Sequence, residues 1–265
     1  THTNFTTPKI LAAAMATEKD SAYVLRLVDF SESSSVVTML TRDHGRISAL
    51  AKGAYRRKGP FDSALDLLTQ SRIVFLRKSS GSLDLLTEAK LQWRFRPPGL
   101  SLAPLYAGYY VAELLLNLTG DYDPHPKLFD LTDNILQGLV QGDEVMPSVL
   151  RFELLTLRLL GHFPNLDTCV ECGEPVQMRG RIAFGQLAGG VLCGKCRPGR
   201  RQVVSASAAM LQLMKNFSDT DNNDWRKTPV DPAVCGELRG LLTHYITHLI
   251  GHKPRMYRYL GGGSK

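Results

Sequence analysis

The pattern of apolar and polar positions changes character near residue 97. Between residues 22 and 96, apolar and β-branched residues form short runs of strand length, separated by polar and glycine-containing turns. The runs occupy residues 23–28, 35–40, 47–51, 71–76 and 83–87. Five short segments of this kind, with no long helix between most of them, are typical of a small closed or partly open β-barrel. The pattern therefore predicts an N-terminal barrel, for which an OB-fold is the natural candidate.

Helical spacing follows the strong chain breaker Pro97-Pro98-Gly99. Apolar residues then recur at three- and four-residue intervals, which predicts a helical body. The predicted helices cover residues 104–118, 126–139, 147–160, 206–217 and 233–250. In the third of these helices, we expect Val149, Phe152, Leu155 and Leu159 to form the buried face.

These patterns predict an α+β protein with several domains. The predicted parts are an N-terminal extension (1–21), an OB-fold (22–96), a helical domain (97–165), a four-cysteine element (166–200), the second part of the helical domain (201–260) and a flexible end (261–265). The extension lacks the basic start and long apolar stretch of a signal peptide. No window contains the roughly 20 apolar residues that a membrane span requires. We therefore expect a cytoplasmic protein.

The spacing of the cysteines is the strongest chemical signal. Cys169-x-x-Cys172 is followed, after twenty residues, by Cys193-x-x-Cys196. Each pair directs two thiolates at one ion, and zinc prefers four such ligands in a tetrahedron. Four thiolates leave no open coordination position, so the expected zinc ion is structural. The alternative is four buried cysteines without metal. We expect Cys235, which lies outside the motif, to be a core residue.

Charge is distributed unevenly along the chain, whose formal net charge is +7. Residues 21–96 contain 13 Lys/Arg and 7 Asp/Glu, whereas residues 97–165 contain 3 and 8. Residues 166–265 contain 14 Lys/Arg and 8 Asp/Glu. This asymmetry suggests a basic face for a polyanion and a separate acidic body.

Basic residues gather on the predicted barrel, where we expect them to bind nucleic acid. The candidates are Arg42, Arg46, Lys52, Arg56, Arg57, Lys58, Arg72, Arg77, Lys78 and Arg94. OB-folds combine a basic groove with aromatic rings on which bases stack. The nearby aromatic residues are Tyr55, Phe61, Phe75, Trp93 and Phe95. A charge run is often only a solvated surface, and Phe75 in particular is expected to belong to the barrel core.

Enzymatic chemistry has little support in the sequence. His244, His248 and His252 recur at four-residue intervals, but no glutamate completes a His-Glu-x-x-His motif. We interpret them as the exposed flank of a helix, with a metal-dependent nuclease as a less favoured alternative. Because phosphate-loop, dinucleotide-binding and Gly-x-Ser-x-Gly motifs are also missing from the sequence, we expect no catalytic residues.

Several segments resemble the bacterial recombination mediator family RecO. The resemblance covers residues 23–260 and is carried by Leu40-Thr41-Arg42-Asp43-His44-Gly45-Arg46-Ile47, Ala51-Lys52-Gly53-Ala54, Leu160-Gly161-His162-Phe163-Pro164-Asn165-Leu166 and the two cysteine pairs. Any one segment is weak, but their order and spacing are specific. The resemblance implies an OB-fold joined to a helical bundle with a zinc-binding element.

The resemblance also implies a function in DNA repair and homologous recombination. Such a protein would bind single- and double-stranded DNA, anneal complementary strands and assist recombinase loading on DNA coated by single-strand-binding protein (SSB). The implied partners are RecR and the acidic tail of SSB. Arg151 and Arg158, seven residues apart, are the candidate tail-binding residues, with local pairing to Glu153 or another carboxylate as the alternative. A rival interpretation is a zinc-ribbon module that acts on RNA or in transcription.

Overall fold

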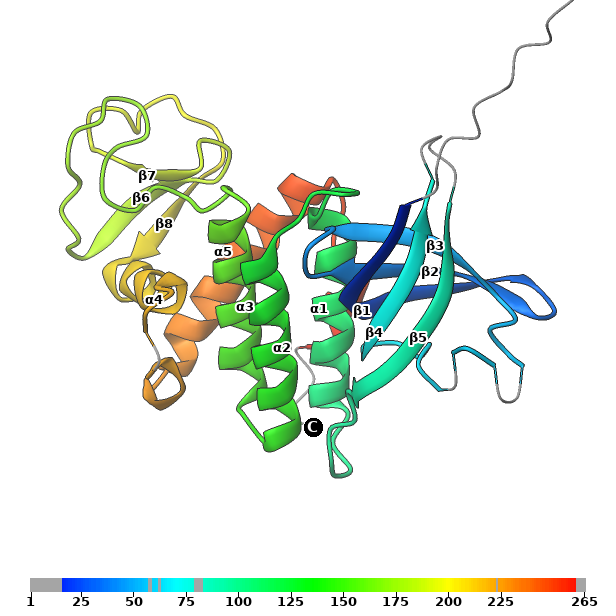
Figure 1. Cartoon of the computed structure of the whole chain (residues 1–265). Helices are drawn as coiled ribbons and strands as arrows, with labels where there is room; N and C mark the ends of the chain where they lie inside the picture. The colour runs from blue at the N-terminus through cyan, green and yellow to red at the C-terminus, as the bar shows by residue number, and fades with distance from the viewer. Residues whose placement is uncertain (1–15, 57–58, 62, 79–82, 223, 261–265) are drawn as a thin grey trace, which may run out of the picture. The chain divides into compact units, whose positions relative to one another are not determined.

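The structure of the protein is a computed structural model that describes residues 16–56, 59–61, 63–78, 83–222 and 224–260. The chain divides into two compact units. Residues 1–39 and 47–93 form the first, which we call the strand-rich unit, and residues 40–46 and 94–265 form the second, which we call the helical unit. Figure 1 shows the elements of both along the chain.

The strand-rich unit contains the N-terminal sheet. Its strands are β1 (Ala16–Ser31), β2 (Ser34–Thr41), β3 (Arg46–Lys52), β4 (Thr69–Arg77) and β5 (Asp84–Arg94). They follow the order β1-β2-β3-β5-β4. Since β4 also pairs antiparallel with β1, from Ala16 opposite Arg77 to Tyr23 opposite Gln70, the sheet closes on itself. β3 and β5 pair in parallel.

Burial along the strands shows why these segments form a sheet. In β4, Thr69, Ser71, Ile73 and Phe75 are buried, whereas the residues between them are exposed or half-buried. This alternation places every second side chain on the inner face of the sheet. The strand β1 begins at Ala16, six residues before the predicted boundary at Ala22, so that 16–21 belong to the sheet rather than to an extension.

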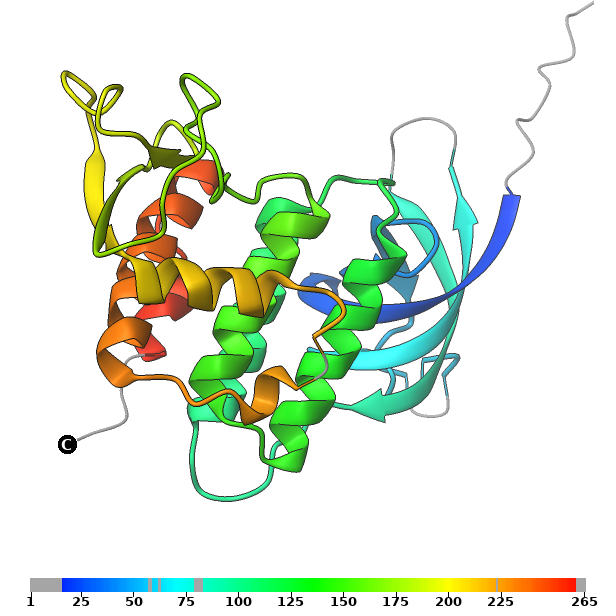
Figure 2. The same ribbon diagram turned by 90° about the vertical axis from the view of Figure 1, so that its left-hand side faces the viewer.

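The helical unit contains α1 (Ala103–Leu118), α2 (Pro126–Gln141), α3 (Val145–Leu159), α4 (Ala208–Ser218) and α5 (Pro232–Ile250). Pro104 and Pro126 lie in the first turns of α1 and α2, where a missing amide hydrogen costs no hydrogen bond. Every residue from Ser148 to Leu157 in α3 is buried. The amphipathic pattern underestimated this burial, because α3 packs against α1, α2 and α4. Figure 2 shows α4 crossing the neighbouring helices.

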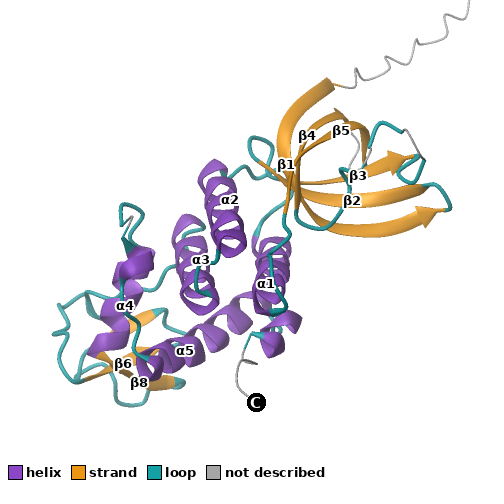
Figure 3. Cartoon of the chain, turned by 90° about the horizontal axis from the view of Figure 1, so that it is seen from below, coloured by secondary structure: helices purple, strands orange, loops and turns teal. Residues whose placement is uncertain are grey.

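A small sheet belongs to the helical unit and has the order β7-β6-β8. Its strands are β6 (Arg181–Gly185), β7 (Gly190–Leu192) and β8 (Val203–Ser207). Figure 3 shows β6 and β8 beside α4 and α5. Only the first of these strands, at residues 181–184, is predicted by a strand-like run in the sequence. Because β8 pairs with β6 as far as Ser207, the four-cysteine element extends beyond its predicted end at residue 200.

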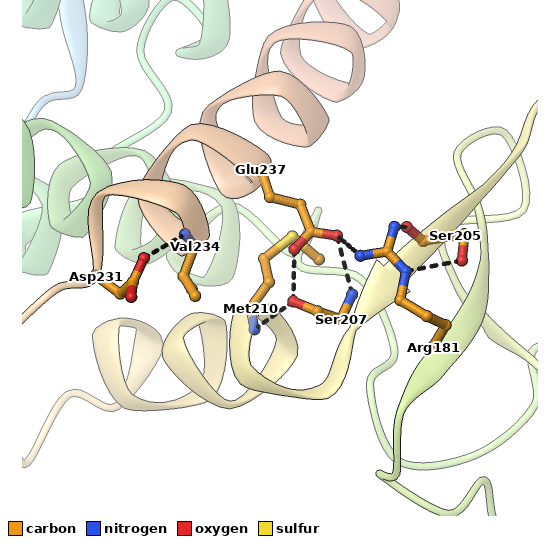
Figure 4. A network of polar contacts seen from close by, with 7 residues as sticks. All are labelled: Arg181, Ser205, Ser207, Met210, Asp231, Val234 and Glu237. Carbon is orange, nitrogen blue, oxygen red and sulfur yellow. Dashed lines mark hydrogen bonds and ion pairs between the residues drawn. The ribbon is translucent and has the colours of Figure 1, made fainter.

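A polar network joins this small sheet to the helices (Figure 4). The carboxylate of Glu237 in α5 accepts hydrogen bonds from the Arg181 guanidinium at 2.8 Å and from the Ser207 hydroxyl at 2.5 Å. The Ser207 hydroxyl also accepts from the amide of Met210 and thereby caps α4. One carboxylate therefore links β6, β8, α4 and α5. Within the described residues, no helix is both long and apolar enough to cross a membrane.

Candidate zinc centre and nucleic-acid interface

Two tight turns bring the four predicted cysteine ligands together. The amide of Gly173 donates to the Cys169 carbonyl at 2.8 Å, and the amide of Cys196 donates to the Cys193 carbonyl at 3.2 Å. Gly173 has a φ of +76°, which a side chain would disfavour. The candidate ligand atoms of the four cysteines all lie within 4.8 Å of one another. The spacing motif thus correctly predicted a cluster, which we call the four-cysteine cluster.

The backbone around the cluster is fixed by the chain segment before it. Asn165 and Gly190 form an isolated β-bridge, in which the amide of Val191 donates to the Asn165 carbonyl at 2.9 Å. The amide of Val170 donates to the Val191 carbonyl at 3.0 Å. A Cβ atom at Gly190 would lie 2.3 Å from the Asn165 carbonyl oxygen, so only glycine permits this approach. The first cysteine pair is therefore held against β7, directly before the second pair.

The geometry and the charge of the cluster fit a tetrahedral metal ion. With a Zn–S distance of about 2.3 Å, the sulfur atoms of a tetrahedral site lie about 3.8 Å apart. The sulfur atoms of Cys172 and Cys193 are 3.8 Å apart. Hydrogen bonds from backbone amides, that of Cys193 first, lower the pKa of Cys169 to about 6. Hydrogen bonds with Cys193 and Cys172 raise the pKa of Cys196 to about 12, so four thiolates require a compensating cation.

The predicted DNA-binding cations fall into two structural groups. Lys52, Arg56, Arg72, Arg77 and Lys78 belong to the strand-rich unit and are exposed. Arg72 and Arg77 project from β4, Lys52 ends β3, and Arg56 follows in the next loop. Arg94 is half-buried at the end of β5. Arg57 and Lys58 lie outside the described residues.

Arg42 and Arg46 are engaged by carboxylates of the helical unit. The Arg42 guanidinium donates from Nε and Nη2 to the two carboxylate oxygens of Asp130, at 3.1 and 2.9 Å. Arg46 pairs with Asp121 at 2.7 Å and also donates to the Leu116 carbonyl. These contacts partly neutralise both side chains, so we rank them below the exposed cations as contacts to DNA.

Most of the candidate stacking rings form the core instead. Phe61, Phe75 and Phe95 are buried, and half-buried Trp93 lies edge-on to Tyr23 with ring centroids 6.5 Å apart. Tyr55 is the exception, with 56% of its surface exposed. The sequence interpretation missed another exposed ring because it treated residues 29–34 as a polar connector. The missed ring is that of Phe30. The sequence feature that could have revealed it is a single aromatic residue among polar residues.

The interpretation of Arg151 as an open docking residue was wrong. Its side chain is buried, and the guanidinium donates hydrogen bonds to the carbonyls of Phe217, Asp219 and Asn222 at 2.9, 2.7 and 3.2 Å. A fourth, longer bond reaches the Asn216 carbonyl. Burial lowers the pKa of Arg151. The predicted alternative was local pairing with Glu153 or another carboxylate. Among the described residues, the Arg151 guanidinium bonds to carbonyls instead, and the side chain of Glu153 accepts a hydrogen bond from Tyr110.

Arg158 reaches the same end of α4, as its seven-residue spacing from Arg151 predicts. Its guanidinium donates to the Ser218 hydroxyl at 2.8 Å and lies 4.2 Å from the centre of the Phe163 ring. Next to Arg151 is a hollow of about 290 Å³ in the helical unit. Its walls include the apolar side chains of Leu131, Ile135, Leu155, Leu159 and Trp225 and the cations Lys127, Arg151 and Arg226.

The histidines do not form a metal site. His244 and His248 are exposed on α5, which ends at Ile250, and His252 lies beyond it. In the part of the chain that the structure describes, the four cysteines are the only group of three or more His, Cys, Asp or Glu residues close enough to hold a metal ion. The predicted role of the histidines as an exposed helix flank agrees with this arrangement.

Comparisons with known proteins agree over most of the chain. The family model "Recombination protein O N terminal" matches residues 15–94, and "Recombination protein O C terminal" matches residues 100–258. A DNA repair protein RecO from Rhodopirellula baltica is 43% identical over 263 residues, covering 90% of this chain and 97% of that protein. The DNA repair protein RecO of Myxococcus xanthus is 33% identical, covering 91% and 96%. These names point to DNA repair and do not favour the RNA or transcription alternative.

Proposed function

Because the chain belongs to the RecO family of DNA repair proteins, we propose that its strand-rich unit is an OB-fold that binds single- and double-stranded DNA. The observation that supports this most directly is the set of exposed cations on the unit. The side-chain charges of Lys52, Arg56, Arg72 and Lys78 form no ion pair or hydrogen bond with another described residue. We assign the DNA contacts to these four, with Arg57, Lys58, Arg77 and Arg94 as further candidates and Arg42 and Arg46 as minor ones.

The mechanism that follows is electrostatic and needs no catalytic residue. Each bound cation displaces counterions from the phosphate backbone, so affinity falls steeply as salt rises. Complementary strands held on such a surface are concentrated while their bases remain able to pair, which promotes annealing. With RecR as a partner, we infer that the protein assists recombinase loading on SSB-coated DNA in the cytoplasm, at the nucleoid.

The four-cysteine cluster has a structural role in this proposal. Cys169, Cys172, Cys193 and Cys196 would hold one zinc ion, which supplies positive charge to balance the thiolates and leaves no position for substrate. The ion would join the segment before β6 to the segment after β7. It therefore stabilises the small sheet rather than acting on DNA chemically.

The hollow beside α3 is our candidate site for the SSB tail. An acidic peptide that ends in apolar side chains matches apolar walls edged by the exposed cation Lys127. Arg226, which is paired with Asp143, contributes less to the attraction. Arg151 contributes here mainly by fixing the wall, since its guanidinium is already bound to carbonyls. Arg158 lies on the same helix and donates a hydrogen bond to the Ser218 hydroxyl, so we assign it the same role of fixing the position of α4.

The DNA-binding proposal is tested by charge reversal on the strand-rich unit. The double variant Lys52→Glu, Arg72→Glu should weaken binding to all DNA sequences alike and reduce the salt dependence by about two phosphate contacts. A matched control is Lys195→Glu, Arg201→Glu, which makes the same charge change at exposed positions near the four-cysteine cluster. Equal affinity and salt dependence in the first variant and the wild type would exclude these cations.

The partner proposal is tested by titration with an acidic, apolar-ended peptide. Lys127→Glu should weaken peptide binding several-fold, because an exposed cation at the edge of the hollow becomes an anion. Lys253→Glu, an exposed position outside the hollow, serves as the control. Unchanged peptide affinity in Lys127→Glu would rule out the hollow. An annealing assay with SSB-coated complementary strands, without nucleotide, tests the activity itself.

A further inference from the structure

An aromatic side chain stands at the tip of the hairpin formed by β1 and β2. Only Glu32 and Ser33 separate the two strands. Just before this turn, 65% of the surface of Phe30 and 44% of that of Val28 are exposed. Residues two positions apart on a strand share one face, so both apolar side chains lie on the same side of β1. The hairpin is the blue loop at the right of Figure 1.

A second exposed ring is held against the same hairpin. Tyr55 follows β3, and its hydroxyl accepts a hydrogen bond from the Ser35 hydroxyl at 2.9 Å and donates one to the Asp29 carboxylate. These bonds satisfy the polar end of Tyr55, while 56% of its surface remains exposed. The ring is thus fixed before any ligand binds, which lowers the entropy cost of using it.

The charges around these rings indicate what kind of ligand they fit. Arg26 is exposed two positions before Val28 on β1, and exposed Arg56 directly follows Tyr55. Lys52 is exposed at the end of β3, close in sequence to Tyr55. Rings bordered by cations match a single nucleic-acid strand, whose bases stack on aromatic faces while its phosphates meet the cations. An apolar peptide would gain nothing from the cations.

We propose that the rings of Phe30 and Tyr55 each offer a stacking surface for an unpaired base, which together we call the platform, and that through it the strand-rich unit prefers single-stranded to double-stranded DNA. The proposal rests on the DNA binding proposed above and names the residues that distinguish single-stranded from double-stranded DNA. In a duplex, each base face is already covered by its neighbours, so the rings contribute little there. The cations serve both forms of DNA, whereas the platform serves only the single strand.

The test compares the affinities of Phe30 variants for a single-stranded oligonucleotide and for the matching duplex. Phe30→Leu keeps an apolar side chain but removes the aromatic face, and should weaken single-strand binding about tenfold. Duplex affinity should stay within about twofold, and the salt dependence should not change because no counterion contact is lost. Since Phe30 is largely exposed, the melting temperature should also remain that of the wild type.

A second variant gives a spectroscopic readout that does not depend on affinity. Phe30→Trp should keep single-strand affinity, and its fluorescence should be quenched by the single strand but not by the duplex. Tyr55→Phe keeps the ring but loses the bonds to Ser35 and Asp29, and should weaken single-strand binding less than Tyr55→Ala. The control Leu187→Ser removes an apolar side chain that is 50% exposed in the helical unit and should change nothing.

The outcomes separate this inference from the proposed function. If the wild type binds DNA with a steep salt dependence but Phe30→Leu loses no single-strand affinity, the platform is wrong and the DNA-binding proposal stands. The same conclusion follows if Phe30→Trp fluorescence responds equally to both forms of DNA. If the wild type ignores DNA even at low salt, the proposed function itself fails.

Discussion

Arginine and lysine residues behave differently in the strand-rich unit and in the helical unit. Lys52 and Arg72 project from strands into solvent, and no described residue neutralises them. In the helical unit, Arg151 is buried against backbone carbonyls and Arg42 is paired with Asp130. A positive charge is available to a polyanion only where the fold has not already bound it. The net charge of a segment alone therefore does not identify a binding surface.

The same comparison applies to polar groups in general. In the helical unit, polar side chains hold elements together, as half-buried Glu237 does for the small sheet and buried Glu153 does through Tyr110. In the strand-rich unit, the hydroxyl of Tyr55 is bound while its ring remains exposed. We therefore expect substitutions in the helical unit to alter mainly stability, and those on the strand-rich surface to alter mainly DNA binding.

Loss of the metal should have the largest effect. Cys172→Ala should abolish binding of one zinc ion per chain and destabilise the helical unit strongly, because a structural zinc site in small domains contributes on the order of 10 kcal/mol. Elemental analysis and thermal melting followed by circular dichroism measure both effects. Cys235→Ala, outside the cluster, should retain the ion. A wild type that binds no zinc when zinc is supplied, or a Cys172→Ala variant that melts like the zinc-loaded wild type, would contradict the zinc assignment.

Removal of Arg151 should have the next largest effect. Arg151→Ala leaves the carbonyls of Phe217, Asp219 and Asn222 without their donor, and should lower the free energy of unfolding by about 4 kcal/mol. Urea denaturation measures the change. Arg158→Ala loses one hydrogen bond and a ring contact at an exposed position, and should cost about 1 kcal/mol. Equal stabilities for the two variants would refute the distinction between them.

Glu153 should make the helical unit less stable as the pH rises. Burial raises the pKa of this carboxyl from 4.5 to about 7, against the opposing influence of Tyr110 and Arg239. The folded chain therefore holds this proton more tightly than the unfolded chain does. The resulting stabilisation is fully present below pH 4.5 and is lost as the pH rises through 7. Its size is about 3 kcal/mol.

The substitution Glu153→Gln isolates this contribution because glutamine stays neutral and still accepts a hydrogen bond from Tyr110. Between pH 5 and pH 8, the variant should gain about 2 to 3 kcal/mol of stability relative to the wild type. Urea denaturation at both pH values, with all other titrating groups common to the two proteins, measures this difference. Parallel pH dependence in the two proteins would show that Glu153 is not the titrating group.

The smallest effect is expected from the removal of single cations, one from each unit. Arg72→Ala should reduce the slope of log K against log salt by about 0.9, the value for one phosphate contact. Arg42→Ala should reduce it less, because the guanidinium is already paired with Asp130. Fluorescence anisotropy over a range of salt concentrations distinguishes the two. A larger change for Arg42→Ala would mean that DNA displaces Asp130 and that the ion pair does not decide availability.

Much of the local structure was predictable because it depends on short-range patterns. Apolar and β-branched runs between turns identified the N-terminal strands, and prolines at their first turns marked α1 and α2. The two Cys-x-x-Cys turns likewise fixed the four-cysteine cluster, since each turn is local and the spacing is distinctive. The strands β7 and β8 escaped notice because they are short and the hydrogen bonds that define them come from other segments, β6 for both strands and Asn165 and Val170 for β7 as well.

Sequence patterns alone were enough for the chain order of the five N-terminal strands and the five helices, for the four-cysteine cluster and for the excess of positive charge near the N-terminus. Which polar groups form hydrogen bonds or ion pairs within the protein depends on the tertiary structure. The helical pattern predicted one buried face for α3, yet every residue from Ser148 to Leu157 is buried. Arg151 and Glu153 lie in this stretch and form hydrogen bonds with Phe217 and Tyr110 of other helices. The tertiary structure also decided that Phe30 is exposed while Phe75 is buried. Periodicity arises between near neighbours in the chain, whereas burial and pairing depend on residues that folding brings together from far apart.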